Sequence, residues 1–250
     1  MSHFTGYKHP LANMVLTGAL ATLCGYAQAA CETPAMLPGA QSYSACKDWP
    51  VTPTMRIYAL AKFEADNSDP SGDIGSYDLS LELRDSSTDA PLAVYHKAQM
   101  FNSDAIAFEG MGIDTARYVL NSSVRAFGVR GNYEHGSSAA PASATDLNLF
   151  IKEPQGLRPV LVGLAVAEGH GESDTVCEGY YVETQRSVEI GKGSSHGFAD
   201  LVVHSVRVRR TSKPYQGECQ ETTGKAQSST LTLHYDGVMY EMPEALKPFR

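Results

Sequence analysis

Long apolar runs and helical periodicity are both scarce in this 250-residue chain. After the first thirty residues, no window offers the roughly 20 uninterrupted apolar residues that a membrane-spanning helix needs. This absence argues against an integral membrane segment in the mature chain. In the same part of the sequence, no window repeats apolar residues at positions i, i+3, i+4 and i+7 over three turns. A parallel sheet built with crossover helices is therefore not expected.

Recognisable catalytic, metal and nucleotide motifs are also missing. The nucleophile elbow G-x-S-x-G of hydrolases does not occur. Ser195 and His196 are adjacent, and adjacent residues of a strand point to opposite faces, so they are badly placed to share a proton. We therefore expect no cofactor and no serine-hydrolase chemistry.

Basic residues are outnumbered by acidic ones. The chain has 20 lysines and arginines against 28 aspartates and glutamates, a formal net charge of −8. Such a surface repels nucleic acid and anionic lipid. It favours solubility or a basic partner, and of these solubility is the commoner reason for such a charge.

The first thirty residues have the pattern of a secretory leader. Lys8 and His9 precede an apolar stretch at residues 11–24, and Ala27-Gln28-Ala29 is the small-x-small pattern that leader peptidases cut. We predict a signal peptide at residues 1–29 and a secreted or periplasmic protein. Losing that one lysine with the leader would change the formal net charge from −8 to −9.

Four of the five cysteines lie outside the predicted leader. An even number of cysteines in an exported chain predicts two disulfides, and four cysteines allow three pairings. We favour the sequence-local pairing, Cys31 with Cys46 and Cys177 with Cys219, because each pair flanks a turn-rich segment. The alternative is a lipoprotein acylated at Cys31, but Gln28 is a poor fit to that signal and acylation would leave one cysteine unpaired.

From residue 55 onward the apolar period is two. Tyr77, Leu79, Leu81 and Leu83 alternate with polar residues, as a strand with one buried face requires. The other runs with strand character lie at residues 55–63, 92–99, 118–124, 126–133, 147–152, 160–166, 180–190, 201–209 and 230–235. About ten strands predict an all-β, mainly antiparallel β-sandwich or flattened barrel.

A single β domain at residues 55–250 is the simplest organisation, although a split into two small sheets near residues 136–145 remains open. Residues 30–54 are expected to form an irregular N-terminal arm with its own disulfide and with Trp49 packed on the domain. Small and polar residues predict loops at 136–145 and 211–229. Asp236-Gly237 predicts a tight hairpin turn near the C-terminus.

Two acidic segments are candidates for cation binding. Glu168, His170, Glu172 and Asp174 alternate along a glycine-rich predicted turn, where they could bind a divalent metal or act as acids and bases. The turn at residues 64–73 carries Glu64, Asp66, Asp69 and Asp73, whose oxygens suit a weak calcium site. In both segments the alternative is a solvated turn built from ordinary turn residues.

A basic and aromatic group is the candidate ligand-binding surface. Arg117, Tyr118, Arg125, Phe127 and Arg130 would line one face if their two segments form a hairpin, and would suit a carboxylate or a sugar. The alternative is that these arginines pair with acidic side chains of neighbouring strands.

One histidine lies on the apolar face of a predicted strand. His204 lies among Val202, Val206 and Val208 at alternate positions, which predicts a hydrogen-bonded histidine on a buried apolar face.

Three functions remain open at this level. The first is a noncatalytic binding module of the cell envelope, which recognises a protein or glycan partner and includes inhibitor-like proteins. The second is a metal-dependent hydrolase that uses Glu168, His170, Glu172 and Asp174. The third is a structural envelope protein without a ligand.

Overall fold

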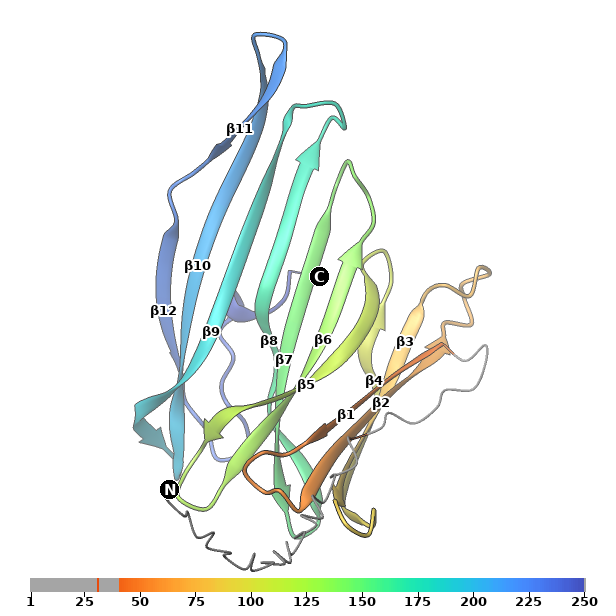
Figure 1. Cartoon of the computed structure of the whole chain (residues 1–250), viewed down its shortest axis with the longest axis vertical. Helices are drawn as coiled ribbons and strands as arrows, with labels where there is room; N and C mark the ends of the chain where they lie inside the picture. The colour runs from red at the N-terminus through yellow and green to blue at the C-terminus, as the bar shows by residue number, and fades with distance from the viewer. Residues whose placement is uncertain (1–30, 32–40, 250) are drawn as a thin grey trace, which may run out of the picture. The chain divides into compact units, whose positions relative to one another are not determined.

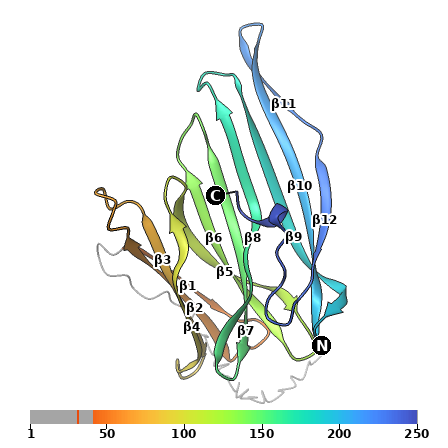
Figure 2. The same ribbon diagram turned by 180° about the vertical axis from the view of Figure 1, so that it is seen from behind.

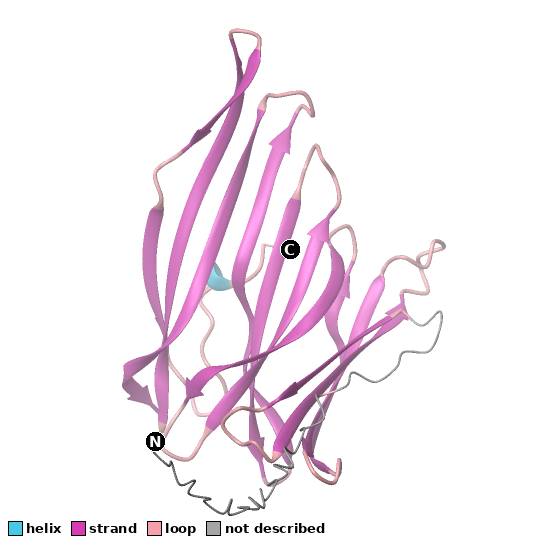
Figure 3. Cartoon of the chain, in the orientation of Figure 1, coloured by secondary structure: helices cyan, strands magenta, loops and turns pink. Residues whose placement is uncertain are grey.

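Two antiparallel sheets make up most of the part of the chain that the structure describes. The computed structural model describes Cys31 and residues 41–249. Twelve strands and one turn of 3-10 helix, η1 (Glu244–Leu246), are found in this part (Figure 1, Figure 3). No helix in the described ranges is long and apolar enough to cross a membrane. The predicted all-β fold is confirmed, and the predicted leader at residues 1–29 lies outside the described residues.

The small sheet consists of four consecutive strands in the order β1-β2-β3-β4. Their bounds are β1 (Ser42–Asp48), β2 (Met55–Ala65), β3 (Gly75–Asp85) and β4 (Pro91–Ser103). Strand β3 has the predicted alternation, with Leu79, Leu81 and Leu83 fully buried.

The large sheet has the order β5-β6-β7-β8-β9-β10-β11, and β12 pairs with β10 on the same edge as β11. It curls into a half-barrel (Figure 1, Figure 2). The bounds are β5 (Ala107–Val119), β6 (Arg125–His135), β7 (Ala142–Glu153), β8 (Gly156–Ser173), β9 (Gly179–Ser195), β10 (Phe198–Tyr215), β11 (Glu218–Thr223) and β12 (Gln227–Leu233).

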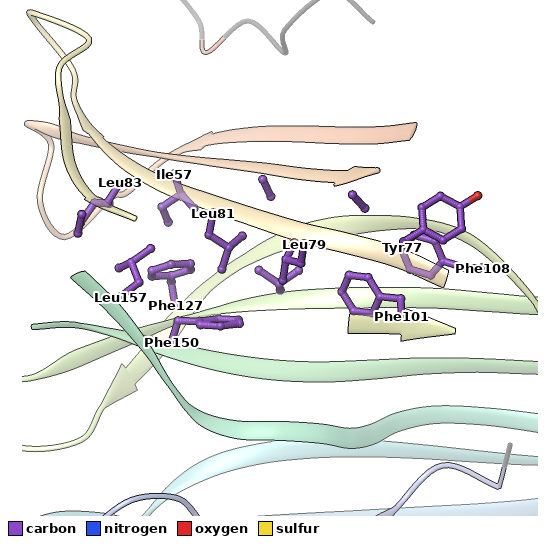
Figure 4. Close-up of a cluster of buried hydrophobic side chains, with 14 of the residues drawn as sticks. Ile57, Tyr77, Leu79, Leu81, Leu83, Phe101, Phe108, Phe127, Phe150 and Leu157 are labelled. Atoms are coloured by element: carbon purple, nitrogen blue, oxygen red, sulfur yellow. The ribbon is translucent and has the colours of Figure 1, made fainter. Parts of the chain in front are cut away.

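The first hydrophobic core lies between the two sheets. Leucines of β3 pack against aromatic side chains of the large sheet, and Figure 4 shows Phe127 and Phe150 facing Leu81 and Leu83. Trp49 packs edge-on against Phe127, with ring centroids 5.5 Å apart. The predicted packing of Trp49 on the domain is therefore confirmed.

The second core lies on the opposite face of β7 and is covered by the C-terminal segment at residues 234–249. Leu147, Leu149 and Ile151 belong to this core, whereas Phe150 belongs to the first. Because alternate residues of β7 enter different cores, both faces of this strand are buried. Leu246 of η1 packs into the second core, and Tyr240 Oη donates a hydrogen bond of 2.6 Å to Ala199 O.

Two local predictions were wrong. Residues 42–48 are not irregular but form β1, which pairs with β2 over its whole length. The predicted loop at 211–229 is mostly strand, since it contains the end of β10, all of β11 and the start of β12. The alternative of a split near 136–145 gains no support, because β6 and β7 lie on either side of the turn at 136–141 and pair directly. Small and polar residues form strands at 42–48 and within 211–229 because neighbouring strands supply their hydrogen bonds.

The sequence pattern predicts a strand only at 118–124, whereas β5 extends from Ala107 to Val119, because two irregularities break the apolar period of this strand. The register with β6 shifts between Phe108 and Gly110 and again between Asp114 and Tyr118. Gly110 has a φ of +131°, and a Cβ there would lie 3.2 Å from the Tyr43 ring. A bulge adds a residue and moves the apolar positions out of phase, so only its last residues were read as a strand, at 118–124. Residues 120–124 form the β5–β6 turn instead.

The C-terminal hairpin is shorter than expected. The turn at Asp236-Gly237 is present, with Asp236 N donating to Met239 O at 2.9 Å. Beyond it, pairing is limited to one bridge between Tyr235 and Tyr240.

Both predicted disulfides are confirmed. Cys31 pairs with Cys46, and Cys177 pairs with Cys219, with Cα atoms 5.7 and 5.5 Å apart respectively. The second bond joins the β8–β9 turn to β11, so it ties the tips of two hairpins together.

Candidate binding groove

The predicted basic and aromatic surface is not brought together on one face. Phe127 is fully buried in the first core, and Tyr118 is buried in the second. Arg130 donates two hydrogen bonds to Asp114 Oδ2, at 2.9 and 2.7 Å. Arg117 is exposed on β5, and Arg125 is partly buried at the start of β6. The ion-pairing alternative therefore describes Arg130, while the two aromatic residues serve as core.

Asp114 is the centre of this network. Its carboxylate accepts bonds from Arg130, from Tyr118 Oη at 2.9 Å and from Ala116 N at 2.9 Å. Burial opposes ionisation of Asp114, but these hydrogen bonds outweigh it and lower the pKa of the carboxyl below its usual value. Desolvation is the largest cause of the raised pKa of Tyr118, and the Asp114 carboxylate raises this pKa further.

Asp114→Asn is expected to lower the free energy of unfolding by about 1.5–3 kcal/mol at neutral pH, because hydrogen bonds to a charged group are lost. A lowered folded-state pKa contributes stability above the unfolded-state pKa of about 4, and this contribution is lost as the pH falls through the folded-state pKa. The difference in the free energy of unfolding between wild type and Asp114→Asn should therefore become smaller below about pH 4. Urea unfolding between pH 7 and 2.5 measures it.

The matched control for this experiment is Glu241→Gln, which neutralises an exposed carboxylate. It should leave the acid dependence of stability unchanged. A wild-type advantage over Asp114→Asn that stays constant down to pH 2.5 would contradict the role given to Asp114.

Most of the acidic segment at 168–174 is strand and not turn, since β8 continues to Ser173. Glu168, His170 and Glu172 lie at alternate positions of β8, and glycine is required at position 169 because the Tyr181 side chain occupies the space of a Cβ. Asp174 accepts backbone bonds from residues 176, 177 and 178, which hold the β8–β9 turn and lower the pKa of this carboxyl.

Glu168 already has a cationic partner. Its Oε2 lies 2.6 Å from Arg186 Nη1, and both side chains are about nine-tenths buried. Across the described residues, no group of three or more His, Cys, Asp or Glu side chains is placed to hold a metal ion. The metal hypothesis for Glu168, His170, Glu172 and Asp174 therefore gains no support from their arrangement.

The acidic turn at 64–73 is organised by its own carboxylates. Asp69 accepts hydrogen bonds from the backbone of Ser71, Asp73 and Ile74, which lower its pKa to about 2. Asp66 accepts from the amide and hydroxyl of Ser68. These carboxylates shape the turn, as aspartates commonly do.

A Ser, His and Asp group occurs at the end of β9 but lacks the geometry of a catalytic triad. Ser195 Oγ donates to Asp200 Oδ1 at 2.7 Å, and both oxygens lie near His234 Nδ1, at 3.2 and 3.1 Å. A triad needs the serine and the aspartate on different ring nitrogens. His196 points elsewhere, with Nδ1 2.8 Å from Tyr235 O.

A groove runs along β10, on the face that the C-terminal segment partly covers. We call it the β10 groove. It consists of three successive hollows of about 470, 250 and 470 Å³. The first two share Arg207 and Gln227, and the last two share Arg209, so the hollows follow one another along the strand.

The C-terminal segment forms one wall of the first hollow. Figure 2 shows this segment and η1 crossing the face of β8 and β9. Phe249 N donates to Glu168 Oε1 at 3.2 Å, and the Phe249 ring lies 5.6 Å from that of His170. Arg186 Nη1 also donates to Ala165 O at 2.9 Å, while its Nε is buried without a hydrogen-bond partner among the described residues.

The central hollow is the most basic part of the groove. It is lined by Val182, Arg207, Arg209, Lys225 and Gln227. No ion pair within the described ranges involves any of these three cations. The guanidinium of Arg209 stacks on Tyr180, 3.9 Å from the ring centroid, which fixes its position.

The third hollow lies next to the disulfide-linked hairpin tips. Lys213 and Thr211 of β10 line it together with Glu172, Glu178 and Asp174. The groove is therefore mixed in charge at this end and positive in the middle.

Sequence patterns did not reveal this groove because the alternation of Val202, His204 and Val206 predicted that the other face of β10 is buried. Leu201 and Val203 belong to the second core instead, whereas Val206 is 43% exposed. His204 is not a core residue either: its side chain is 42% exposed and its Nδ1 lies 3.1 Å from Thr230 Oγ1. The available signal was the alternation of Arg207 and Arg209, which places both guanidiniums on one side of a strand.

Comparisons with known proteins add no identity to this geometry. No protein family model, no curated protein and no solved structure matches the chain.

Proposed function

We propose that this protein is a noncatalytic binding module exported to the cell envelope or beyond it, and that it holds a protein or glycan partner in the β10 groove. The observation that carries the proposal is a continuous groove whose middle is lined by cations without ion-pair partners among the described residues. A purely structural protein gains no stability from grouping like charges in this way.

The noncatalytic part of the proposal is supported by the state of the reactive side chains. Glu168 is bound to Arg186, and Asp174 caps a turn. Ser195 and Asp200 approach the same nitrogen of His234. Export is supported by two disulfides, which persist in oxidising compartments.

Filling the groove tests the proposal. Ser205 lines the first hollow, and Ser205→Trp is expected to weaken the binding of a groove ligand at least tenfold. Ser187 lies on the neighbouring strand, opposite His204 on the other face of the sheet, so Ser187→Trp is the matched control. Binding is measured on arrays of glycans and envelope proteins, with a melting curve to show that each variant folds.

A second variant guards against misfolding at position 205. Ser229→Trp fills the same hollow from exposed β12 and should reproduce the loss. Ligands bound equally well by all variants would place the site elsewhere, and the absence of any ligand would favour the structural alternative.

A further inference from the structure

Positive charge in the central hollow is local and unopposed. Arg207, Arg209 and Lys225 line it, and no carboxylate does. The chain as a whole has a net charge of −8, so this concentration runs against its composition. Charges of one sign gathered in a hollow raise the local concentration of ligands of the opposite sign. The chemistry of the hollow therefore selects an anionic ligand.

The length of the groove selects an extended ligand. Arg207 and Arg209 are two residues apart on β10, which places their backbone positions about 7 Å apart along the strand. The groove continues past them on both sides, toward Phe249 at one end and Lys213 at the other. A chain with regularly repeated anionic groups can contact both arginines and extend into the first hollow, whereas the third hollow also carries Glu172, Asp174 and Glu178.

The walls offer side chains rather than backbone groups. Strands β9 and β10 pair with each other beneath the groove, and β10 pairs with β11 and β12 on its other side, so the amides and carbonyls of β10 take part in sheet hydrogen bonds. A peptide that binds as an added strand needs a free sheet edge, which β9 and β10 do not offer beneath the central hollow. The uncharged polar side chains of the first hollow carry hydroxyls and one amide, and its charged or titratable ones are Glu168, His170, Arg186 and Arg207. The uncharged ones are Thr184, Ser205, Ser228, Ser229 and Gln227.

Single-stranded nucleic acid fits the groove less well. Such ligands bind by stacking bases on open aromatic faces. Tyr180 is the aromatic residue beside the central cations, and the guanidinium of Arg209 already covers one face of its ring. Phe249, which is 45% exposed, lies beside His170 at the end of the groove and does not line the central hollow. The hydroxyls, amides and arginines of the groove suit a ligand rich in hydroxyl and carboxylate groups.

We propose that the β10 groove binds a linear polysaccharide whose sugars carry carboxylates. The proposal rests on the proposed function and specifies its ligand. Arg207 and Arg209 donate to successive carboxylates, and Lys225, in the segment between β11 and β12, adds a point charge. The serine, threonine and glutamine side chains of the first hollow bond to sugar hydroxyls.

Polygalacturonate and its methyl ester test the charge requirement on one backbone. The purified protein is titrated with each polymer by isothermal calorimetry at low and high salt. We expect binding to polygalacturonate that is at least tenfold tighter than binding to the ester and that weakens with salt. The double substitution Arg207→Gln and Arg209→Gln should reduce it at least tenfold.

Arg210→Gln is the matched control, because Arg210 is the neighbouring arginine of β10 and pairs with Glu183 on the other face. It should bind polygalacturonate as wild type does. Polyglutamate and single-stranded DNA are titrated in parallel as other polyanions.

Each outcome separates the two proposals. Equal binding of polygalacturonate and its ester, or equal loss with Arg210→Gln, overturns the charged-polysaccharide proposal and leaves a groove for neutral glycans or a protein. Tighter binding of polyglutamate or DNA overturns it in favour of another polyanion. No binding of any polymer, together with no ligand sensitive to Ser205→Trp, overturns both proposals.

Discussion

Phe108→Ala is expected to lower the free energy of unfolding by about 3–5 kcal/mol, the usual cost of truncating a fully buried phenylalanine. Phe108 is 2% exposed and lies where β4 passes into β5, between the two sheets. Its ring contacts those of four other residues at centroid distances of 4.7 to 5.4 Å: Tyr43, Tyr77, Phe101 and Tyr133. Removing it leaves a cavity that rings from both sheets surround.

Thermal and urea unfolding measure this effect. A loss of this size should lower the melting temperature by roughly 6–20 °C in a chain of this length. Tyr215→Ala is the control, since this aromatic side chain is 59% exposed at the β10–β11 tip. It should change stability by less than about 1 kcal/mol. Similar losses for both variants would mean that the inter-sheet cluster contributes far less than its burial indicates.

Glu168→Leu is expected to destabilise the protein by about 3–5 kcal/mol, because it leaves the charge of Arg186 buried without its anion. The two side chains are 11% and 8% exposed, and their closest atoms are 2.6 Å apart. The same substitution removes the acceptor of Phe249 N, so the C-terminal segment should also lose part of its attachment. Hydrogen exchange at residues 244–249 and urea unfolding report the two effects separately.

A double-mutant cycle shows whether the pair acts as a unit. Arg186→Met alone should also be destabilising, while Glu168→Leu combined with Arg186→Met should cost less than the sum of the two, since no isolated charge remains. Strictly additive losses would argue that the two side chains act independently.

The sequence was sufficient for the fold class because most strands alternate regularly. Tyr77, Leu79 and Leu81 show the period of a half-buried strand, and the apolar run of β7 shows one buried on both faces. Bulges concealed β5, and glycines that make room for Tyr181 made part of β8 look like a turn. Both errors come from contacts between strands, which a local pattern does not contain.

The candidate groove needed information that no single segment carries. Arg207 and Lys225 meet because β12 returns along β10 with Gln227 opposite Arg207. That register depends on the chain between the strands, which was expected to be a loop. The predicted cluster of Arg117, Tyr118, Arg125, Phe127 and Arg130 failed to form a surface for a related reason. Phe127 is buried in the first core and Tyr118 in the second, and Arg130 binds Asp114, which is sixteen residues away in the sequence.

The order of strands has a consequence for how the chain folds. In both sheets, each strand from β1 to β4 and from β5 to β11 pairs with its neighbour in sequence. In such a meander, most paired strands are separated in the sequence by a single turn. The small sheet can therefore assemble before the strands of the large sheet are available. A chain that becomes available from its N-terminus could add one hairpin at a time, with few unpaired edges exposed at any moment.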